Sequence, residues 1–182
     1  MADAHFRLTI GNGDASIAHI DFAALESFRF PDGLGYPPSY QAFVRECGWA
    51  RTFGLWLIYP PVLPGYADGR ERADNLTARF LDSYLDGQSE EFDWMVEPDG
   101  TWGTPASLRV FGWSENGDAL LWDTSARRRD GEFPVWESRG LNALHLLGGS
   151  LAEALPLLRE RANAHSAPAD CVDVEPLTPA RL

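Results

Sequence analysis

Between Leu108 and Asp123 the chain reads LRVFGWSENGDALLWD. Two apolar runs, Leu108–Trp113 and Ala119–Asp123, flank the dipeptide Asn116-Gly117. Asn-Gly between such runs is the strongest short-range signal for a β-hairpin, because both central residues of a type I′ turn need positive φ. This stretch therefore predicts two antiparallel strands joined by a tight turn.

Further strands are predicted on both sides of the hairpin. Asp130-Gly131 repeats the turn signal before an apolar run at Phe133–Glu137, and Ala143–Leu147 has the composition of a last strand. Upstream, the alternating large side chains of Trp49–Tyr59 predict one continuous strand, which ends where two prolines remove backbone donors. His5–Ile10 is expected to form a first strand.

Helices are predicted before, between and after these strands. Their signals are apolar residues at helical spacing, proline in the first turn, glycine just past the last residue and a capping box. The predicted helical segments are Asp21–Phe28, the segment from Pro38 to Cys47 before Gly48, Arg70–Leu85 ended by Gly87, and a final helix behind the capping box of Ser150 and Glu153.

Together these elements predict one α+β domain with a central, largely antiparallel sheet flanked by helices. We expect this domain to span residues 1–163. The remainder, residues 164–182, is short of large apolar side chains and contains Pro168, Pro176 and Pro179. A flexible C-terminal tail is therefore predicted.

Composition limits the classes of partner. The 182 residues carry 27 acidic and 15 basic side chains, a formal net charge of -12. Nucleic acid and anionic lipid are themselves negative, so this charge argues against both and favours a basic protein partner. No basic segment precedes a long apolar run, and no stretch approaches the roughly eighteen apolar residues of a membrane span. We therefore expect a cytoplasmic protein without a membrane segment.

Tests for an enzyme are negative. Gly11–Ser16 lacks the third glycine of a dinucleotide fingerprint, and Ser114 has the wrong spacing for a nucleophile elbow and suits a turn instead. Cys47 lies at a helix C-terminus, where the helix dipole disfavours a thiolate, and is expected to be a packed, inert thiol. The other candidate ligands, Cys171, His5, His19, His145 and His165, show no metal-binding spacing. We expect no catalytic residue, cofactor or metal.

The acidic residues are unevenly distributed. Seven carboxylates and no arginine lie between Asp82 and Asp99, with Trp94 inside this run and Trp102 just past it. Tryptophan surrounded by charge is typical of a protein-binding hot spot. The alternative is a solvated loop whose tryptophans pack into the core. The candidate partner-binding residues are Glu90, Glu91, Asp93, Trp94, Glu97, Asp99 and Trp102.

Arg127-Arg128-Arg129 is the one cluster of basic residues in the sequence. It follows the predicted hairpin. In an acidic protein three arginines in a loop more often offset nearby carboxylates than bind phosphate. We therefore assign them no functional role.

The order and spacing of these motifs resemble the SMI1/KNR4 group of the SUKH superfamily. The similarity covers roughly residues 17–161. Its motifs in this sequence are Leu25-Glu26, YPPSYQAF at residues 36–43, Cys47-Gly48-Trp49, FGWSENGD at residues 111–118, Leu121-Trp122-Asp123, GEFPV at residues 131–135 and the closing helix from Ser150.

The resemblance implies an α+β fold, no catalytic activity and, in bacteria, an immunity protein that binds and neutralises a toxin domain, often a nuclease. We therefore expect a monomer that occludes a basic toxin domain, with the Asp82–Asp99 segment steering its approach. The alternative is a regulatory or scaffold module with a cellular partner, as in eukaryotic relatives. A small hydrolase that uses scattered carboxylates is a third interpretation.

Overall fold

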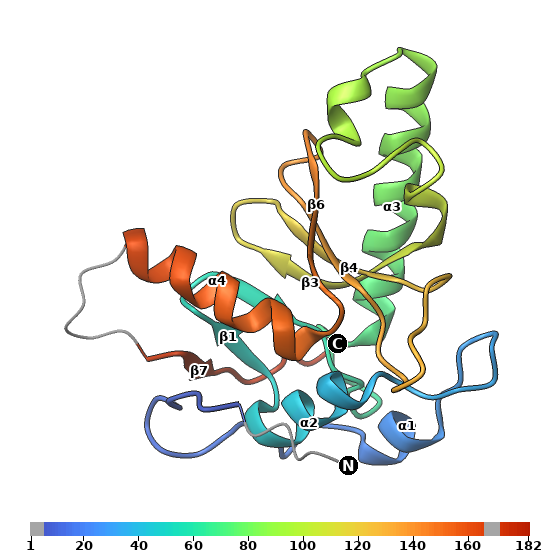
Figure 1. Ribbon diagram of the computed structural model, residues 1–182. Coiled ribbons are helices and arrows are strands. Elements are labelled where there is room, and N and C mark those ends of the chain that lie inside the picture. The colour runs from blue at the N-terminus through green and yellow to red at the C-terminus, as the bar shows by residue number, and fades with distance from the viewer. Residues whose placement is uncertain (1–5, 166–171) are drawn as a thin grey trace.

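The hairpin predicted at residues 108–123 is present in the computed structural model, which describes residues 6–165 and 172–182. It forms the centre of a seven-stranded sheet with the order β6-β5-β4-β3-β2-β1-β7, in which every neighbouring pair is antiparallel (Figure 1). Helices pack against this sheet, so the predicted α+β architecture with an antiparallel sheet is confirmed.

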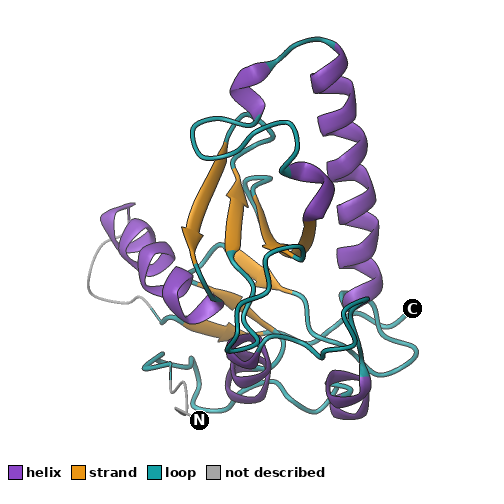
Figure 2. Ribbon diagram, turned by 45° about the vertical axis from the view of Figure 1, so that its right-hand side comes forward, coloured by secondary structure: helices purple, strands orange, loops and turns teal. Residues whose placement is uncertain are grey.

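Figure 2 distinguishes the helices from the strands by colour. The strands are β1 Ala50–Thr52, β2 Trp56–Ile58, β3 Leu108–Ser114, β4 Ala119–Asp123, β5 Val135–Ser138, β6 Leu144–Gly148 and β7 Val174–Pro176. The helices are α1 Phe22–Ser27, α2 Pro38–Cys47, α3 Arg70–Ser89 and α4 Leu151–His165, and two short 3-10 turns are η1 Asp93–Met95 and η2 Pro105–Ser107.

The turn between β3 and β4 differs from the predicted type I′ geometry. Of its two central residues, only Gly117 has positive φ, at 88°. Ser114 N–H donates to the Asp118 carbonyl at 2.8 Å, and the Ser114 hydroxyl accepts from the amides of Asn116 and Asp118. The loop therefore has three residues and a glycine bulge, and the hydrogen bonds to the Ser114 side chain satisfy two of its amides.

The single strand predicted at Trp49–Tyr59 is wrong. The chain reverses at Phe53 and Gly54, which both have positive φ, at 52° and 69°, and β1 and β2 form a short hairpin. A bulky residue rarely adopts positive φ, so the aromatic alternation hid this turn. The strand predicted at His5–Ile10 is also wrong for its described residues, because only Ile10 pairs, in one bridge to Val174. His5 lies outside the described residues.

The flexible tail predicted for residues 164–182 is wrong for residues 172–182. Here β7 pairs with β1, and Val174 is fully buried. Asp173 accepts the Arg159 guanidinium of α4 at 2.7 Å. Long-range pairing of the backbone thus holds a segment whose composition suggests a loop, and the folded unit extends beyond the predicted boundary at residue 163. Residues 166–171 lie outside the described residues.

Helix α3 continues past the predicted stop at Gly87, which is buried inside its last turns. A Cβ atom on Gly87 would collide with the Met95 sulfur of η1. This glycine therefore allows close packing between two segments and does not cap the helix.

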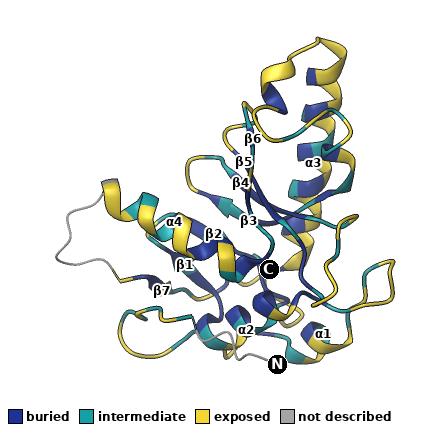
Figure 3. Cartoon of the chain, viewed as in Figure 1, coloured by how far each residue is buried: buried dark blue, intermediate teal, exposed yellow. Residues whose placement is uncertain are grey.

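The sheet carries a hydrophobic cluster on each face. Leu120 and Trp122 of β4 face the cluster covered by α1, α2 and α4, whereas Leu121 faces the cluster beneath α3. The first cluster is rich in aromatic rings, such as the stacked pair Phe111 and Trp122 at 4.3 Å. Figure 3 shows the buried sheet between the two helical layers. Alternation along one strand thus builds two cores.

Polar contacts cap two of the helices, one contact between segments far apart in sequence and the other local. Glu132, in the loop before β5, accepts from the Ser39 amide and hydroxyl at 2.7 and 2.6 Å and so caps α2. Burial raises the pKa of the Glu132 carboxyl. The capping box before α4 is half formed, since Glu153 N–H donates to the Ser150 hydroxyl while its carboxylate accepts from Gly149 N–H.

Candidate protein-interaction site

The acidic segment predicted from sequence forms one end of the molecule. We call residues 82–102, which comprise the second half of α3, η1 and the loop that follows, the acidic tip. In Figure 1 it stands at the top, furthest from α1 and α2. Phe92 N–H donates to the Gly87 carbonyl at 2.9 Å, and the Tyr84 hydroxyl donates to the Met95 carbonyl at 2.9 Å. The tip is therefore folded back onto α3.

The carboxylates of the tip are open to solvent. All seven, namely Asp82, Asp86, Glu90, Glu91, Asp93, Glu97 and Asp99, are exposed. None of them forms an ion pair with any residue that the structure describes. Residues 82–102 contain no arginine, lysine or histidine. The tip is thus a concentrated, solvated source of negative potential.

Three of the predicted site residues also have a structural contact. The Asp93 carboxylate accepts from Trp102 Nε1 at 2.7 Å. Asp99 accepts from the Leu146 amide at 3.0 Å and thereby covers part of the open edge of β6. Glu90, Glu91 and Glu97 have exposed side chains.

The two tryptophans of the tip have different environments. Trp94 is 50% exposed and stacks on Phe92, which is 38% exposed, with ring centroids 4.6 Å apart. Trp102 is half-buried and packs edge-on against Tyr84 of the core, with centroids 6.3 Å apart. The exposure of Trp94 therefore fits the hot-spot interpretation, whereas part of the Trp102 ring is buried by packing against the core.

Sequence reasoning missed two apolar residues of this site. Phe92 lies between Glu91 and Asp93, outside any periodic pattern, and that isolation among charges is a signal that it is exposed. Helical periodicity assigns Leu85 to the apolar face of its helix, yet it is 62% exposed. Beside Leu85 is a groove of about 310 Å³, lined by Leu81, Tyr84, Leu85, Gln88, Trp102, Pro105 and Ala106.

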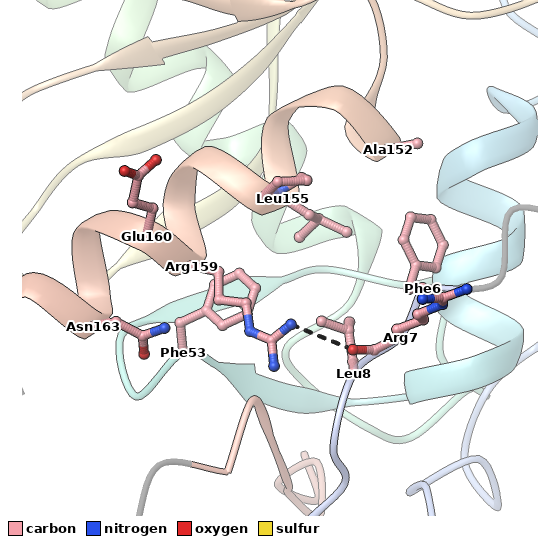
Figure 4. A pocket seen from close by; sticks show the side chains of 10 residues that line it. Phe6, Arg7, Leu8, Phe53, Ala152, Leu155, Arg159, Glu160 and Asn163 are labelled. Atoms are coloured by element: carbon pink, nitrogen blue, oxygen red, sulfur yellow. Dashed lines mark hydrogen bonds between the residues drawn. The ribbon is translucent and has the colours of Figure 1, made fainter. Parts of the chain in front are cut away.

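A larger cavity, of about 630 Å³, lies between α4, the segment around Leu8 and the β1–β2 turn (Figure 4). Phe53 and Leu155 supply apolar surface there. Arg159 points into this region, but its guanidinium is bonded to Asp173, and it also donates to the Arg7 carbonyl at 3.4 Å. Glu160 is the one carboxylate among the lining residues, and they include no serine, cysteine or histidine. This lining provides no nucleophile paired with a base.

The other residues that the sequence offers for catalysis or metal binding are not placed for either role in the described structure. Cys47 is buried, and burial raises the pKa of its thiol to about 12, so it is not a thiolate at neutral pH. The Ser114 hydroxyl is bonded within its own turn. Among the described residues no cluster of three or more potential ligands is placed to hold a metal ion. Cys171 lies outside the described ranges.

The arginine cluster offsets carboxylates, as predicted, at two of its three positions. Arg127 pairs with Asp32 and lies 3.9 Å over the Phe133 ring. Arg128 pairs with Asp130 at 3.0 Å and with Glu153 at 2.9 Å. These contacts tie loops to the body of the protein.

Residues 6–165 and 172–182 contain no helix that is both long and apolar enough to span a membrane. Comparisons with protein families, with curated proteins and with solved structures find no match. The candidate function therefore depends on the geometry of the tip and on the sequence motifs.

Proposed function

We propose that this protein is a non-catalytic binding module whose acidic tip engages a basic protein partner. The observation that carries the proposal is the exposed Phe92–Trp94 stack, set among carboxylates that form no ion pair within the described part of the chain. Large aromatic rings left in water favour burial in an interface, where tryptophan is strongly enriched among hot spots.

The two features of the tip have separate roles in this proposal. The carboxylates attract a basic partner over a distance of about 8 Å at physiological ionic strength and raise the association rate. Phe92 and Trp94 become buried only after contact, so they slow dissociation. No group is required to react, because a partner is inhibited when its functional face is covered.

The partner class follows from the resemblance to the SMI1/KNR4 group. We propose that the partner is a toxin domain, such as a nuclease, and that this protein acts in the cytoplasm as its immunity protein. An antiparallel α+β domain supports this assignment, and so does the net charge of -12, since a domain that binds nucleic acid presents a basic face. The second candidate, a regulatory scaffold for a cellular partner, uses the same tip.

The test is co-expression with the product of the neighbouring gene, followed by co-purification and a kinetic binding measurement. Trp94→Ala is expected to raise the dissociation rate at least tenfold, as hot-spot truncations do. Leu157→Ala, at an exposed apolar position on α4, is the matched control. Survival of cells that express the neighbouring toxin separates immunity from a scaffold role.

The charge contribution is tested with Glu90→Gln/Glu91→Gln against Glu71→Gln/Glu160→Gln, which removes the same charge from exposed positions outside the tip. We expect only the first pair to slow association at low salt, and the difference should disappear as salt is raised. Equal rates for the two pairs would remove the tip from the interface.

A further inference from the structure

One face of α3 carries a stripe of two leucines and a glutamine, in which Leu85 and Gln88 are exposed while Leu81 packs partly against the cluster beneath α3. Leu81, Leu85 and Gln88 are spaced i, i+4 and i+7 and so share this face. Leu85 is 62% exposed, more than any other large hydrophobic side chain in the described chain except Leu182. A soluble helix normally turns such a stripe towards the core.

The opposite wall of the groove is preformed. Trp102, Pro105 and Ala106 face the stripe. The indole of Trp102 is fixed on one side by its hydrogen bond to Asp93 and on the other by its contact with Tyr84. A wall held in this way loses little conformational entropy when a ligand binds.

The rim of the groove is acidic. Asp82 is exposed on α3 three residues before Leu85 and so borders the stripe, and the Asp93 carboxylate accepts from Trp102 Nε1 of the opposite wall. The nearest cations in the sequence are Arg79, one turn earlier on α3, and Arg109, whose guanidinium donates to the Ala106 carbonyl at 3.1 Å. Except near Arg79 and Arg109, the charge around this groove is negative.

We infer that this groove receives a basic amphipathic helix of the protein partner, and the inference rests on the proposed function of the tip. From Leu81 to Gln88 the stripe is about 10 Å long, which matches two turns of a second helix. Two apolar side chains of that helix, spaced i and i+3 or i+4, enter the groove. Lysine or arginine residues on its flanks then face Asp82 and Asp93.

A helix fits this groove better than an extended peptide does. The stripe lies on a helix whose backbone groups are bonded within α3, so it offers no row of free donors and acceptors for an added strand. Side-chain ridges packed into grooves are the mode of contact between two helices, and an amphipathic helix in an apolar groove is a common form of peptide recognition.

The experiment uses three fluorescent synthetic peptides and the full chain. The first is a 14-residue leucine and lysine peptide with helical periodicity, the second a scrambled peptide of the same composition, and the third has glutamate in place of lysine. Fluorescence anisotropy gives each affinity. We expect the periodic basic peptide to bind at least tenfold more tightly than either of the others.

Variants place the binding in the groove. Leu85→Ser should weaken binding of the periodic basic peptide about tenfold, whereas Leu157→Ser, at an exposed apolar position of α4, should leave it unchanged. Ala106→Leu fills the groove from its other wall and should also weaken binding. Both groove positions are exposed, and thermal melting checks that each variant is folded.

Equal affinity for the periodic and scrambled peptides, or an unchanged affinity of Leu85→Ser, overturns the inference. The two proposals can fail separately. If Trp94→Ala and the Glu90/Glu91 pair weaken the cognate complex while Leu85→Ser does not, the tip binds its partner without the groove. If Leu85→Ser alone weakens that complex, the groove is the interface and the Phe92–Trp94 stack with Glu90 and Glu91 is not.

Discussion

Carboxylates in the acidic tip and in the rest of the described protein, which we call the body, have different environments. Glu137 and Glu91 illustrate the difference. Glu137 of β5 is fully buried and accepts from Arg161 at 2.6 and 2.7 Å and from Arg139 at 2.9 Å. Glu91 is exposed, without an ion pair to any described residue. The first contributes to folding, while the second is available to an approaching partner.

This contrast indicates where substitutions affect stability. Residues in the body are constrained by long-range contacts, as in the cap that Glu132 provides for α2. The charges of the tip repel one another and contribute little to folding, since unpaired surface charges are worth tenths of a kcal/mol. Stability should therefore fall when the body is altered, and binding should fall when the tip is altered.

The largest expected effect in the body is that of Gly48→Ala. Gly48 ends α2 with φ of 64°, and a Cβ atom there would collide with the Ser16 carbonyl, the acceptor of Trp49 N–H. We expect a loss of about 3 kcal/mol in the free energy of unfolding. Urea titration measures it. Gly54→Ala, with positive φ but open space, is the control and should cost only about 1 kcal/mol.

Glu137→Gln should cost about 2 to 3 kcal/mol at pH 7, because it removes the buried negative charge with which Arg139 and Arg161 pair. Burial alone would raise the pKa of Glu137, but the hydrogen bonds and charge of Arg161 and Arg139 hold it below the ordinary 4.5. Its stabilisation is thus fully present above that value and is lost as pH falls through the folded pKa. Urea denaturation at both pH values should show a smaller difference in the free energy of unfolding between the native protein and Glu137→Gln at pH 3 than at pH 7. An equal difference at the two pH values would contradict this explanation.

Val174→Ala tests whether β7 belongs to the body. Truncating this fully buried side chain should cost about 1.5 kcal/mol. Val172 is 42% exposed in the same segment, and Val172→Ala should change the urea midpoint very little. If the two variants have the same urea midpoint, β7 does not pack against the sheet in solution.

The smallest effect is expected at the tip. Glu90→Gln/Glu91→Gln should change the free energy of unfolding by less than about 0.5 kcal/mol, with a slight gain from reduced repulsion. Thermal melting at low and high salt measures it. A loss greater than about 1 kcal/mol would show that these carboxylates support the fold and would erase the contrast with the body.

Much of the fold is predictable from neighbouring residues. Asn116-Gly117, Pro38 with Gly48, and the Ser150 cap act within a few positions of the turn or helix they define, so their effect survives without tertiary context. The acidic tip is likewise visible as a run of charge. What could not be predicted there is exposure: Trp94 and Trp102 look equivalent in sequence, yet only one packs on Tyr84.

The sequence by itself determined the hairpin around Asn116-Gly117, the helix starts and the concentration of charge between Asp82 and Asp99, because turn, capping and charge patterns are local properties of the chain. Tertiary structure alone decided that Val174 pairs beside β1, that Glu132 caps a helix 93 residues earlier and that Leu85 faces water. Each of these depends on contacts between distant segments, whose free energy is set by packing and backbone pairing and leaves no local pattern.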